Sequence, residues 1–354
     1  MEFERYFLEQ LHRHPSMKAQ DVVKMCYQAA FGAEHLLQDK ARAEAYFMKE
    51  YEETEAKEMP LYEEISENIC RVNLAAWKYH SLPAAWLFRI FAASCGKREG
   101  GEELFYSYLK QAEALLVETL ISQEEWQTYL AEYEKKGLSP VHHSDNYREK
   151  EHPAYRIVDR KYIRLLPILQ KTAEKMQEKD VVVIAIDGRA ASGKTTATGY
   201  LQGILSAEVI RMDDFFLPME LRTPERFAQP GGNVHQERFM EEVLPFLSQE
   251  KAFSYQIFDC GRMDYHGNQE ISVGKFRIVE GSYSCHPVFG RYADVVVFSD
   301  VDAEEQMERI RSRNGEKMAE MFRTRWIPLE EAYFTAYDIA AKADIILKQK
   351  TDLI

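Results

Sequence analysis

The sequence IDGRAASGKTT occupies residues 186–196 and directly follows an apolar run at residues 181–185. It matches the phosphate-binding pattern G-x-x-x-x-G-K-[ST], in which glycines let the backbone turn its N–H groups inward around a phosphate. The lysine supplies a mobile cation, the threonine offers a hydroxyl to Mg²⁺, and the N-terminus of the following helix adds positive charge. An apolar strand before the motif and helical spacing after it favour a nucleoside triphosphate site over a chance glycine-rich turn. The predicted nucleotide-binding residues are Gly188, Ala190, Ala191, Ser192, Gly193, Lys194, Thr195 and Thr196.

The residues around this motif indicate an α/β domain. Short β-branched runs alternate with helical stretches throughout residues 179–354, and this order predicts crossover units and a parallel sheet. The runs that we expect to be strands are 181–186, 209–212, 276–279, 295–298 and 345–347.

Residues 1–150 have a different pattern. Apolar residues recur at three- and four-residue spacing and strand-like alternation is absent, so we predict an all-α domain of unknown role. Residues 136–153 are polar, contain one glycine and two prolines, and form the best linker candidate, in which we expect His142 and His143 to be exposed. We assign 151–178 to the linker and a connecting helix that starts at residue 155. The clearest helical patterns before it lie at 20–37, 61–79, 83–93 and 102–120.

Composition and charge limit the classes of partner. The chain has 354 residues and a formal net charge of −13, which argues against broad binding to nucleic acid or acidic lipid. No apolar run approaches the roughly 18 residues of a membrane span. The start, MEFERYFLEQ, lacks the segments of a signal peptide and the five cysteines form no CxxC pair, so we expect a cytoplasmic protein with reduced thiols. The expected partner is a small molecule, and assembly of the apolar helix faces into a homo-oligomer is left open.

Acidic residues follow two of the predicted strands. Asp213 and Asp214 come after the run at 209–212, and Glu280 comes after the run at 276–279. Ligands of open α/β sheets bind at the carboxyl ends of the strands. A carboxylate there can take a proton from an attacking hydroxyl or hold Mg²⁺. Each acid alone is more often a helix cap or part of a turn, but their common placement after strands favours a site.

Five arginines gather near residues 309–325 of an otherwise acidic chain. They form either a lid that closes over the triphosphate and neutralises its charge, or a solvated helix face paired with neighbouring glutamates. Both interpretations fit the sequence, although the lid is favoured for the group. The arginines are Arg309, Arg311, Arg313, Arg323 and Arg325, and the glutamates are Glu304, Glu305, Glu308 and Glu316.

Two groups of polar residues in the first half are weaker candidates. Glu34 and His35 are either an acid/base pair, part of a metal site, or simply packed and capped; the last is favoured because sequence neighbours face different ways on a helix. Arg71, Asn73 and Arg89 stand in an apolar stretch and suggest a polar pocket.

These motifs resemble the uridine kinase family of P-loop kinases, which also includes phosphoribulokinase and the bacterial pantothenate kinases. IDGRAASGKTT is similar to the family's phosphate loop, MDDFF to its Asp-x-Phe-[Tyr/Phe] motif, and VEGSY to its Val-Glu-Gly motif. YADVVVFSDVDAEEQMERIRSRNG resembles its strand, turn and arginine lid. The resemblance covers residues 181 to about 347 and implies a P-loop kinase domain that uses ATP and Mg²⁺. It implies that Asp213 is the general base, that Glu280 supports the metal, and that Arg309 and Arg313 reach the phosphates.

The acceptor side departs from the family pattern. GGNVHQERF falls where the family carries its acceptor segment. Uridine kinases follow a Tyr-Asp-Phe with a histidine and an arginine that touch the nucleoside, whereas this chain has FDCGRMDYH, so uridine itself is in doubt. His286 either lies near the acceptor or caps a helix. The candidate acceptor residues are Asn233, Arg238, Asp259, Arg262 and His266.

The predicted reaction transfers the γ-phosphoryl group of ATP to a hydroxyl of a nucleoside or similar metabolite. Thr195, Glu280 and Asp213 are the predicted metal-binding residues. The predicted catalytic residues are Asp213, Lys194, Arg309 and Arg313. The alternative is a nucleotide-dependent regulator or interaction protein, in which binding at Lys194 repositions the helical half and little transfer occurs. Asp213 separates the two, because a catalytic base is needed for transfer but contributes little to nucleotide affinity.

Overall fold

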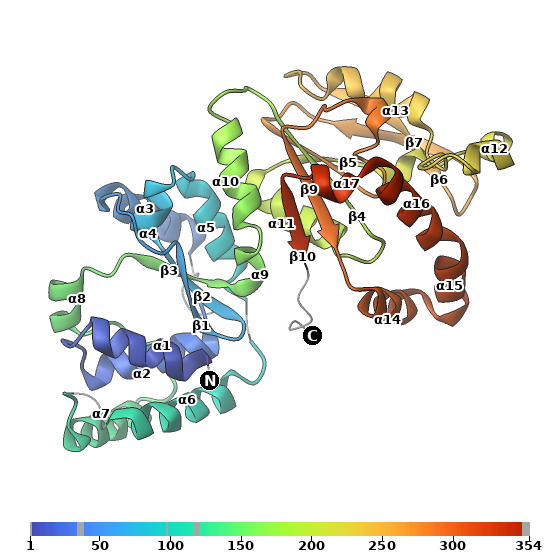
Figure 1. Cartoon of the computed structure of the whole chain (residues 1–354). Helices are drawn as coiled ribbons and strands as arrows, with labels where there is room; N and C mark the ends of the chain where they lie inside the picture. Colours follow the sequence, from blue (N-terminus) through green and yellow to red (C-terminus); the bar gives the residue numbers. More distant parts are fainter. Residues whose placement is uncertain (1, 34–38, 97, 117–119, 349–354) are drawn as a thin grey trace. The chain divides into compact units, whose positions relative to one another are not determined.

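The structure is a computed structural model that describes residues 2–33, 39–96, 98–116 and 120–348. The chain divides into two compact units, Met1–Arg164 (unit 1) and Leu165–Ile354 (unit 2), whose elements are labelled in Figure 1. Each unit buries its own set of apolar side chains. Within the described ranges, no helix combines the length and apolarity needed to cross a membrane.

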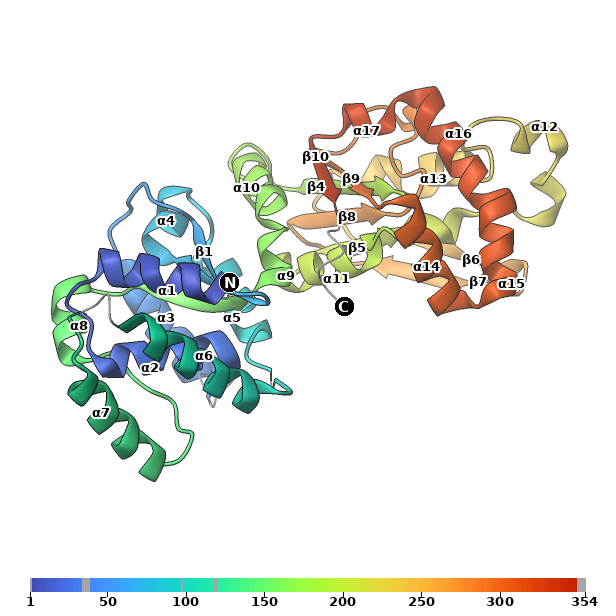
Figure 2. The same ribbon diagram turned by 60° about the horizontal axis from the view of Figure 1, so that its bottom comes forward.

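The helices of unit 1 begin at residues suited to capping. The side chains of Asp39, Ser122 and Ser144 each accept a hydrogen bond from the backbone N–H three residues later, which satisfies one free donor of the first turn. Helix α2 packs against α6 and α7, as Figure 2 shows. The helices are α1 (Glu2–Arg13), α2 (Ala19–Phe31), α3 (Lys40–Glu53), α4 (Leu74–Tyr79), α5 (Ala84–Ala93), α6 (Gly101–Leu115), α7 (Gln123–Lys135), α8 (Asp145–Glu151) and α9 (Arg160–Ile163).

Unit 1 also contains a three-stranded antiparallel sheet, so the prediction of an all-α first domain is wrong. Its strands are β1 (Tyr62–Ser66), β2 (Ile69–Asn73) and β3 (Tyr155–Asp159), in that order across the sheet. All five residues of the central strand β2 are buried, so the alternation of polar and apolar residues that marks a half-buried strand is missing. In strands this short, the apolar residues of β1 and β2 also satisfy helical spacing.

The join between the units differs from the predicted connecting helix. That segment forms β3, then α9, then α10 (Leu166–Lys175). β3 pairs with β2 along its whole length, which places Ile157 and Val158 in the buried part of the sheet. Residues up to 164 therefore belong to unit 1, and α10 belongs to unit 2.

Unit 2 is built on a five-stranded parallel sheet in the order β10-β9-β4-β8-β5. Each predicted run forms one of its strands, which confirms the parallel α/β architecture. Because all five strands point the same way, their carboxyl ends lie along one edge, where ligands of such sheets bind. The strands are β4 (Val182–Gly188), β5 (Glu208–Arg211), β8 (Phe276–Glu280), β9 (Val295–Asp300) and β10 (Ile345–Lys348).

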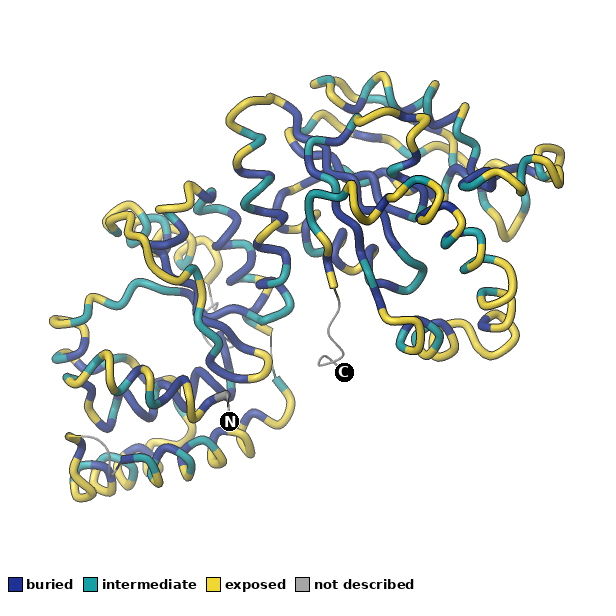
Figure 3. Tube along the Cα trace, viewed as in Figure 1, coloured by how far each residue is buried: buried dark blue, intermediate teal, exposed yellow. Residues whose placement is uncertain are grey.

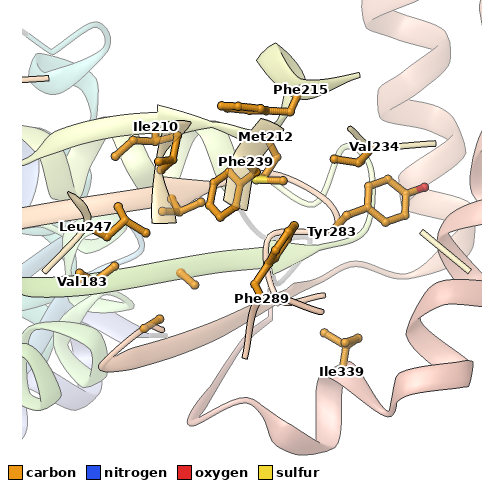
Figure 4. Close-up of a cluster of buried hydrophobic side chains, with 14 of the residues drawn as sticks. Val183, Ile210, Met212, Phe215, Val234, Phe239, Leu247, Tyr283, Phe289 and Ile339 are labelled. Carbon is orange, nitrogen blue, oxygen red and sulfur yellow. The ribbon is translucent and has the colours of Figure 1, made fainter. Parts of the chain in front are cut away.

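Both faces of this sheet are covered. Helices α10 and α11 (Lys194–Leu205) pack against strands β4, β8 and β9. An apolar cluster that includes Val183, Ile210, Phe239 and Phe289 is drawn in Figure 4. Every residue of β4 is buried, so the strand that ends in the phosphate motif is held firmly on both sides.

The other elements of unit 2 lie around this sheet. Strands β6 (Phe253–Asp259) and β7 (Asp264–Ile271) form a hairpin that the sequence pattern did not predict, because most of β7 is exposed. Helices α14 and α15 are also largely exposed, as Figure 3 shows. Two helices precede the hairpin: α12 (Pro224–Phe227) and α13 (Gln236–Glu242). The helices that follow it are α14 (Ala303–Asn314), α15 (Glu316–Met321), α16 (Ile327–Tyr337) and α17 (Ile339–Lys342).

Candidate functional site

The loop between β4 and α11 has the backbone of an anion-binding turn. Ala191 and Gly193 have positive φ angles of 56° and 86°, and left-handed residues in such turns direct successive N–H groups into one concavity. Gly188 has φ 139°, and a Cβ there would lie 2.0 Å from the Ser299 carbonyl oxygen of β9. Only glycine fits at this position. The other predicted residues share the turn: Ala190 is partly buried, Ser192 is buried, and Thr195 and Thr196 are exposed.

The Lys194 ammonium lies across this loop. Its Nζ donates to the carbonyl oxygens of Gly188 (2.7 Å) and Arg189 (2.8 Å) and to Ser282 Oγ (3.3 Å). The side chain is 9% exposed, so its charge stays in a setting of low dielectric, where it attracts an anion more strongly than in water. This geometry is suited to holding phosphate oxygens.

Asp187, one residue before the first glycine, supports the loop from below. It is fully buried and accepts hydrogen bonds from the backbone N–H groups of Gly188 (2.7 Å), Tyr283 (3.1 Å) and Cys285 (2.9 Å) and from the Tyr333 hydroxyl (2.8 Å). These bonds tie the phosphate loop to the segment after β8 and to α16. Sequence reasoning missed this role, although an acid at the end of a buried strand was a visible signal.

Glu280 faces the phosphate loop from the end of β8. It is 6% exposed, and the Thr195 hydroxyl donates to its Oε1 at 3.3 Å. Burial raises the pKa of Glu280, and the nearby Asp213 carboxylate raises it further. The structure thus brings together a hydroxyl and two carboxylates, the predicted metal-binding set.

Asp213 and Asp214 are neighbours with different surroundings. Asp213 lies in the short 3₁₀ helix Met212–Phe215 and lines the cavity in front of the phosphate loop. The surrounding protein desolvates its carboxyl and raises its pKa, while the charges of Lys194, Arg211 and Arg313 oppose this rise. Asp214 instead accepts a hydrogen bond from the Tyr255 hydroxyl (2.9 Å). Only the first acid is therefore available to chemistry in the cavity.

The cavity at the carboxyl edge of the sheet has a volume of about 430 Å³. It joins the loop lysine, the loop threonine and both acids to a wall of aromatic side chains. The polar side chains on its lining are Lys194, Thr195, Asp213, Arg222, Asn233, Glu280, Ser282, Arg313 and Glu330, and the aromatic ones are Phe216, Phe227, Tyr283, Phe322 and Trp326.

The arginine cluster divides between the two interpretations that the sequence left open. Arg313 lines the cavity, and Arg309 donates to the Ala191 carbonyl of the phosphate loop (3.2 Å) while it pairs with Glu305. Two others form surface ion pairs: Arg311 with Glu316 and Arg323 with Glu320. Arg325 lies over the Trp326 ring, 4.9 Å from its centroid. Arg313 therefore faces the cavity, whereas Arg309 is bound to the outside of the phosphate loop.

Glu330 of α16 is a further site residue that no motif indicated. It is 7% exposed, its Oε2 accepts from the Ala190 N–H of the loop (2.9 Å), and its Oε1 accepts from Ser282 Oγ (2.8 Å). Burial raises its pKa, which the nearby Lys194 charge opposes. Since Ala190 is 140 positions away in sequence, only the folded chain reveals this contact.

Of the five candidate acceptor residues, only Asn233 lines the cavity. Arg238 has a packing role instead: it is 7% exposed, pairs with Glu242 (2.8 Å) and lies over the rings of Phe215 and Tyr265. The others belong to the β6–β7 hairpin, outside the described cavity lining. Asp259 accepts from the Gly261 N–H (2.7 Å), and Arg262 contacts His266 (3.1 Å) on the surface.

The remaining candidates have structural roles or fall outside the described chain. His286 caps a 3₁₀ turn by accepting from the Val288 N–H (3.2 Å). Arg71 pairs with Glu63 (2.5 Å) in unit 1, and Asn73 donates to the Pro60 carbonyl (2.8 Å). Glu34 and His35 lie outside the described residues.

The oxygen ligands around Thr195 fit a magnesium ion better than a transition metal. No three His, Cys, Asp or Glu side chains gather as a ligand set in the part of the chain that the structure describes. Mg²⁺ commonly uses one or two carboxylates, waters and substrate phosphates rather than a full protein cage. Thr195, Glu280 and Asp213 match that requirement.

No protein-family model matches the chain, and no curated protein matches it. Many solved structures are similar to part of it, and three of them are described below. One, described as a possible uridine kinase from Bacillus stearothermophilus, is 18% identical over 53% of this chain and 98% of its own (TM-score 0.40). A second, described as a fructose transport system kinase from Silicibacter sp. TM1040, is 20% identical over 52% of this chain and 98% of its own (TM-score 0.42). A third, a shikimate kinase from Bacteroides thetaiotaomicron, is 18% identical over 47% of this chain and 84% of its own (TM-score 0.25).

Proposed function

We propose that unit 2 is a kinase that transfers the γ-phosphoryl group of ATP to a hydroxyl of a small metabolite, with Mg²⁺ as cofactor. The observation that carries the proposal is one shared cavity: Lys194, Thr195, Asp213 and Glu280 all line it at the carboxyl edge of the sheet. Phosphoryl transfer depends mainly on positioning and on stabilising negative charge. A cation, an amide-lined turn and two carboxylates around one space supply both.

Each side chain has a role in this proposal. The loop amides and Lys194 hold the β- and γ-phosphates, and Thr195 with Glu280 holds the metal. Mg²⁺, when bound, neutralises charge on these phosphates. Asp213 takes the proton from the acceptor hydroxyl, and its raised pKa brings it nearer to the value at which a general base works best. Arg313 approaches the phosphates from the α14 side, and Arg309 holds the phosphate loop from outside.

The aromatic wall supports a particular kind of acceptor. Phe216, Phe227 and Trp326 line the cavity together with Asn233. Flat apolar surfaces with one amide favour a ring-bearing metabolite over a small open-chain sugar, because rings stack on aromatic faces and the amide reads a polar edge. A nucleoside or a similar ring compound is therefore our proposed acceptor.

The test measures ADP release from ATP and Mg²⁺ by the full chain with a panel of nucleosides, pantothenate, glycerate and sugars. We expect one acceptor to raise the rate well above the basal value. Asp213→Asn should lower this acceptor-dependent rate by roughly 10²- to 10⁴-fold with little change in ATP affinity. Asp214→Asn is the matched control and should keep most of the activity.

Two outcomes would contradict the proposal. One is tight ATP binding with no acceptor-dependent release from any compound. The other is full activity in Asp213→Asn. Either result would favour a nucleotide-dependent regulator, in which the same loop binds ATP without transfer.

A further inference from the structure

Unit 1 contains a cavity of about 630 Å³ that no motif in the sequence marks. Its described lining comes from α2, α3, α5, the segment before α8, and β3. Small-molecule sites commonly have volumes of roughly 300–1,000 Å³. The size therefore suits a metabolite.

A continuous hydrogen-bond network forms one wall of this cavity. His143 Nδ1 lies 3.0 Å from Asp21 Oδ1, and His143 Nε2 lies 2.7 Å from the Tyr155 hydroxyl. The Tyr155 hydroxyl also lies 3.2 Å from Gln28 Oε1. His143, Tyr155 and Gln28 all line the cavity. His143 is thus not the exposed linker residue that the sequence suggested.

The buried end of the network fixes its orientation. Asp21 is fully buried and also accepts from the Ser144 N–H (2.9 Å), the Ser144 hydroxyl (2.6 Å) and the Lys18 N–H (3.0 Å). An ionised carboxylate only accepts hydrogen bonds, so His143 Nδ1 carries the proton that faces Asp21. The single hydroxyl proton of Tyr155 is shared between two neighbours, Gln28 Oε1 and His143 Nε2. The wall is therefore preorganised before any ligand arrives.

The lining of the cavity is cationic in a chain of net charge −13. Lys24, Arg42 and Arg156 line it, and Asp39 is the one acid on its described lining. Asp39 keeps its negative charge while its carboxylate caps α3 at the Arg42 N–H (3.1 Å), so the cations on the described lining outnumber it. Arg156 is paired with Glu50 (2.6 Å). Lys24 and Arg42 are the two cations left to meet a ligand.

Lys24 has no counter-charge in contact within the part of the chain that the structure describes. Among the described residues its Nζ donates to one acceptor, the Val141 carbonyl (3.1 Å). Burial lowers its pKa to about 8, with Arg148 adding to the effect and Asp21 opposing it. A desolvated ammonium that faces a cavity without a carboxylate partner is costly unless an anion completes the site.

We propose that this cavity binds a small phosphate monoester, whose phosphate is held by Lys24 and Arg42 and whose organic part lies against Tyr46 and Phe91. A phosphate monoester is close to a dianion at neutral pH, so it matches two cations from two different helices. Arg42 lies in the first turn of α3, where the helix dipole also favours negative charge. The proposal does not depend on the kinase activity of unit 2.

The test is isothermal titration of the full chain that carries Lys194→Ala, which weakens phosphate binding at the loop of unit 2. The probes are inorganic phosphate, glucose 6-phosphate, uridine 5′-monophosphate and, as a carboxylate counterpart, glucuronate. We expect saturable binding of at least one of the two esters. Lys24→Met and Arg42→Met should each weaken it by about tenfold or more, which corresponds to about 1.4 kcal/mol. Lys110→Met on the exposed face of α6 is the control and should leave it unchanged.

Several results would overturn the proposal. One such result is that neither ester binds the Lys194→Ala chain. Another is that the Lys24→Met and Arg42→Met variants bind the ester as tightly as the parent chain does. Stronger binding of glucuronate than of glucose 6-phosphate would reject the phosphate class, and binding of inorganic phosphate alone would reject the ester. Tryptophan fluorescence checks the fold of each variant, and Arg42→Met decides if Lys24→Met unfolds, because Arg42 is exposed.

Discussion

The phosphate-loop cavity of unit 2 and the cationic cavity of unit 1 are built in different ways. In unit 2 the predicted core of the site, Lys194, Thr195, Asp213 and Glu280, comes from one contiguous turn and from the ends of neighbouring strands. In unit 1 the polar groups come from α2, the start of α3, the segment before α8, and β3, and the contact between Asp21 and His143 spans 122 positions. The first site depends on backbone geometry and the second on side-chain packing. The two should therefore fail under different substitutions.

Gly188→Ala should break the first site most severely. The added methyl group would meet the Ser299 backbone at 2.0 Å, and φ 139° is already unsuited to alanine. Every residue of β4 is buried and so is Ser299 of β9, which leaves the two strands little room to separate. We expect the free energy of unfolding of unit 2 to fall by more than about 4 kcal/mol, at the far end of the range for single substitutions. Denaturant unfolding and ATP titration measure it; a stable variant that binds ATP normally would contradict the backbone explanation.

This contrast also explains what the sequence could reveal. The phosphate loop, Asp213 and Glu280 were predictable because parallel strands bring their carboxyl ends to one edge whatever the rest of the chain does. Glu330 was not, since it reaches the loop from α16 across 140 positions. Asp187 stood inside the quoted motif, and only its burial shows that it braces the loop.

The fold of unit 1 was harder to predict for a related reason. The five parallel strands of unit 2 are separated by helices, so each stands out as a β-branched run. In unit 1, strands β1 and β2 each have five residues, and every residue of β2, the central strand of the sheet, is buried. Its third strand, β3, joins from residue 155. A sheet assembled from distant short segments leaves no local periodicity to detect.

A change of pH should break the unit 1 network. Burial lowers the pKa of His143 to about 4, with Lys24 and Arg71 adding to the effect and Asp21 opposing it. Below the ordinary value of about 6.5, the unfolded chain therefore binds a proton that the folded chain does not, so stability falls as pH falls from 6.5 to about 4. The shift corresponds to about 3 kcal/mol. The lowered pKa of Asp21 adds a loss only below its ordinary value, near pH 4.

Denaturant unfolding at pH 7.5, 6 and 5 measures this effect by tryptophan fluorescence, since three of the four tryptophans lie in unit 1. His143→Gln should flatten the profile across this range. His142→Gln is the matched control, because the His142 imidazole is next in sequence but exposed. This variant should keep the wild-type slope of stability against pH. Equal slopes in wild type and His143→Gln would show that the buried imidazole does not control the stability of unit 1.

Two arginines of the exposed helix α14, Arg313 and Arg311, allow a cavity contact to be compared with a surface ion pair. Both are exposed, but only Arg313 lines the cavity, while Arg311 pairs with Glu316. Arg313→Ala should lower kcat by about 10- to 100-fold, or about 1.4–2.7 kcal/mol, with a smaller change in KM for ATP, since transition-state charge is what a guanidinium stabilises. Arg311→Ala should stay near the wild-type rate. Equal losses in both variants would indicate a general effect on the helix rather than a phosphate contact.

Gly203→Ala should have the smallest effect and the opposite sign to Gly188→Ala. Gly203 lies on the exposed side of α11, where an added Cβ meets nothing within 4 Å and the φ is an ordinary helical one. Alanine is favoured over glycine in helices by about 1 kcal/mol, so the free energy of unfolding of unit 2 should rise by up to that amount with ATP affinity unchanged. An added methyl group would then stabilise helix α11 at position 203 but would block the native backbone of the phosphate loop at position 188. A loss of stability in Gly203→Ala would mean that α11, like β4, has no room for a side chain beyond its native ones.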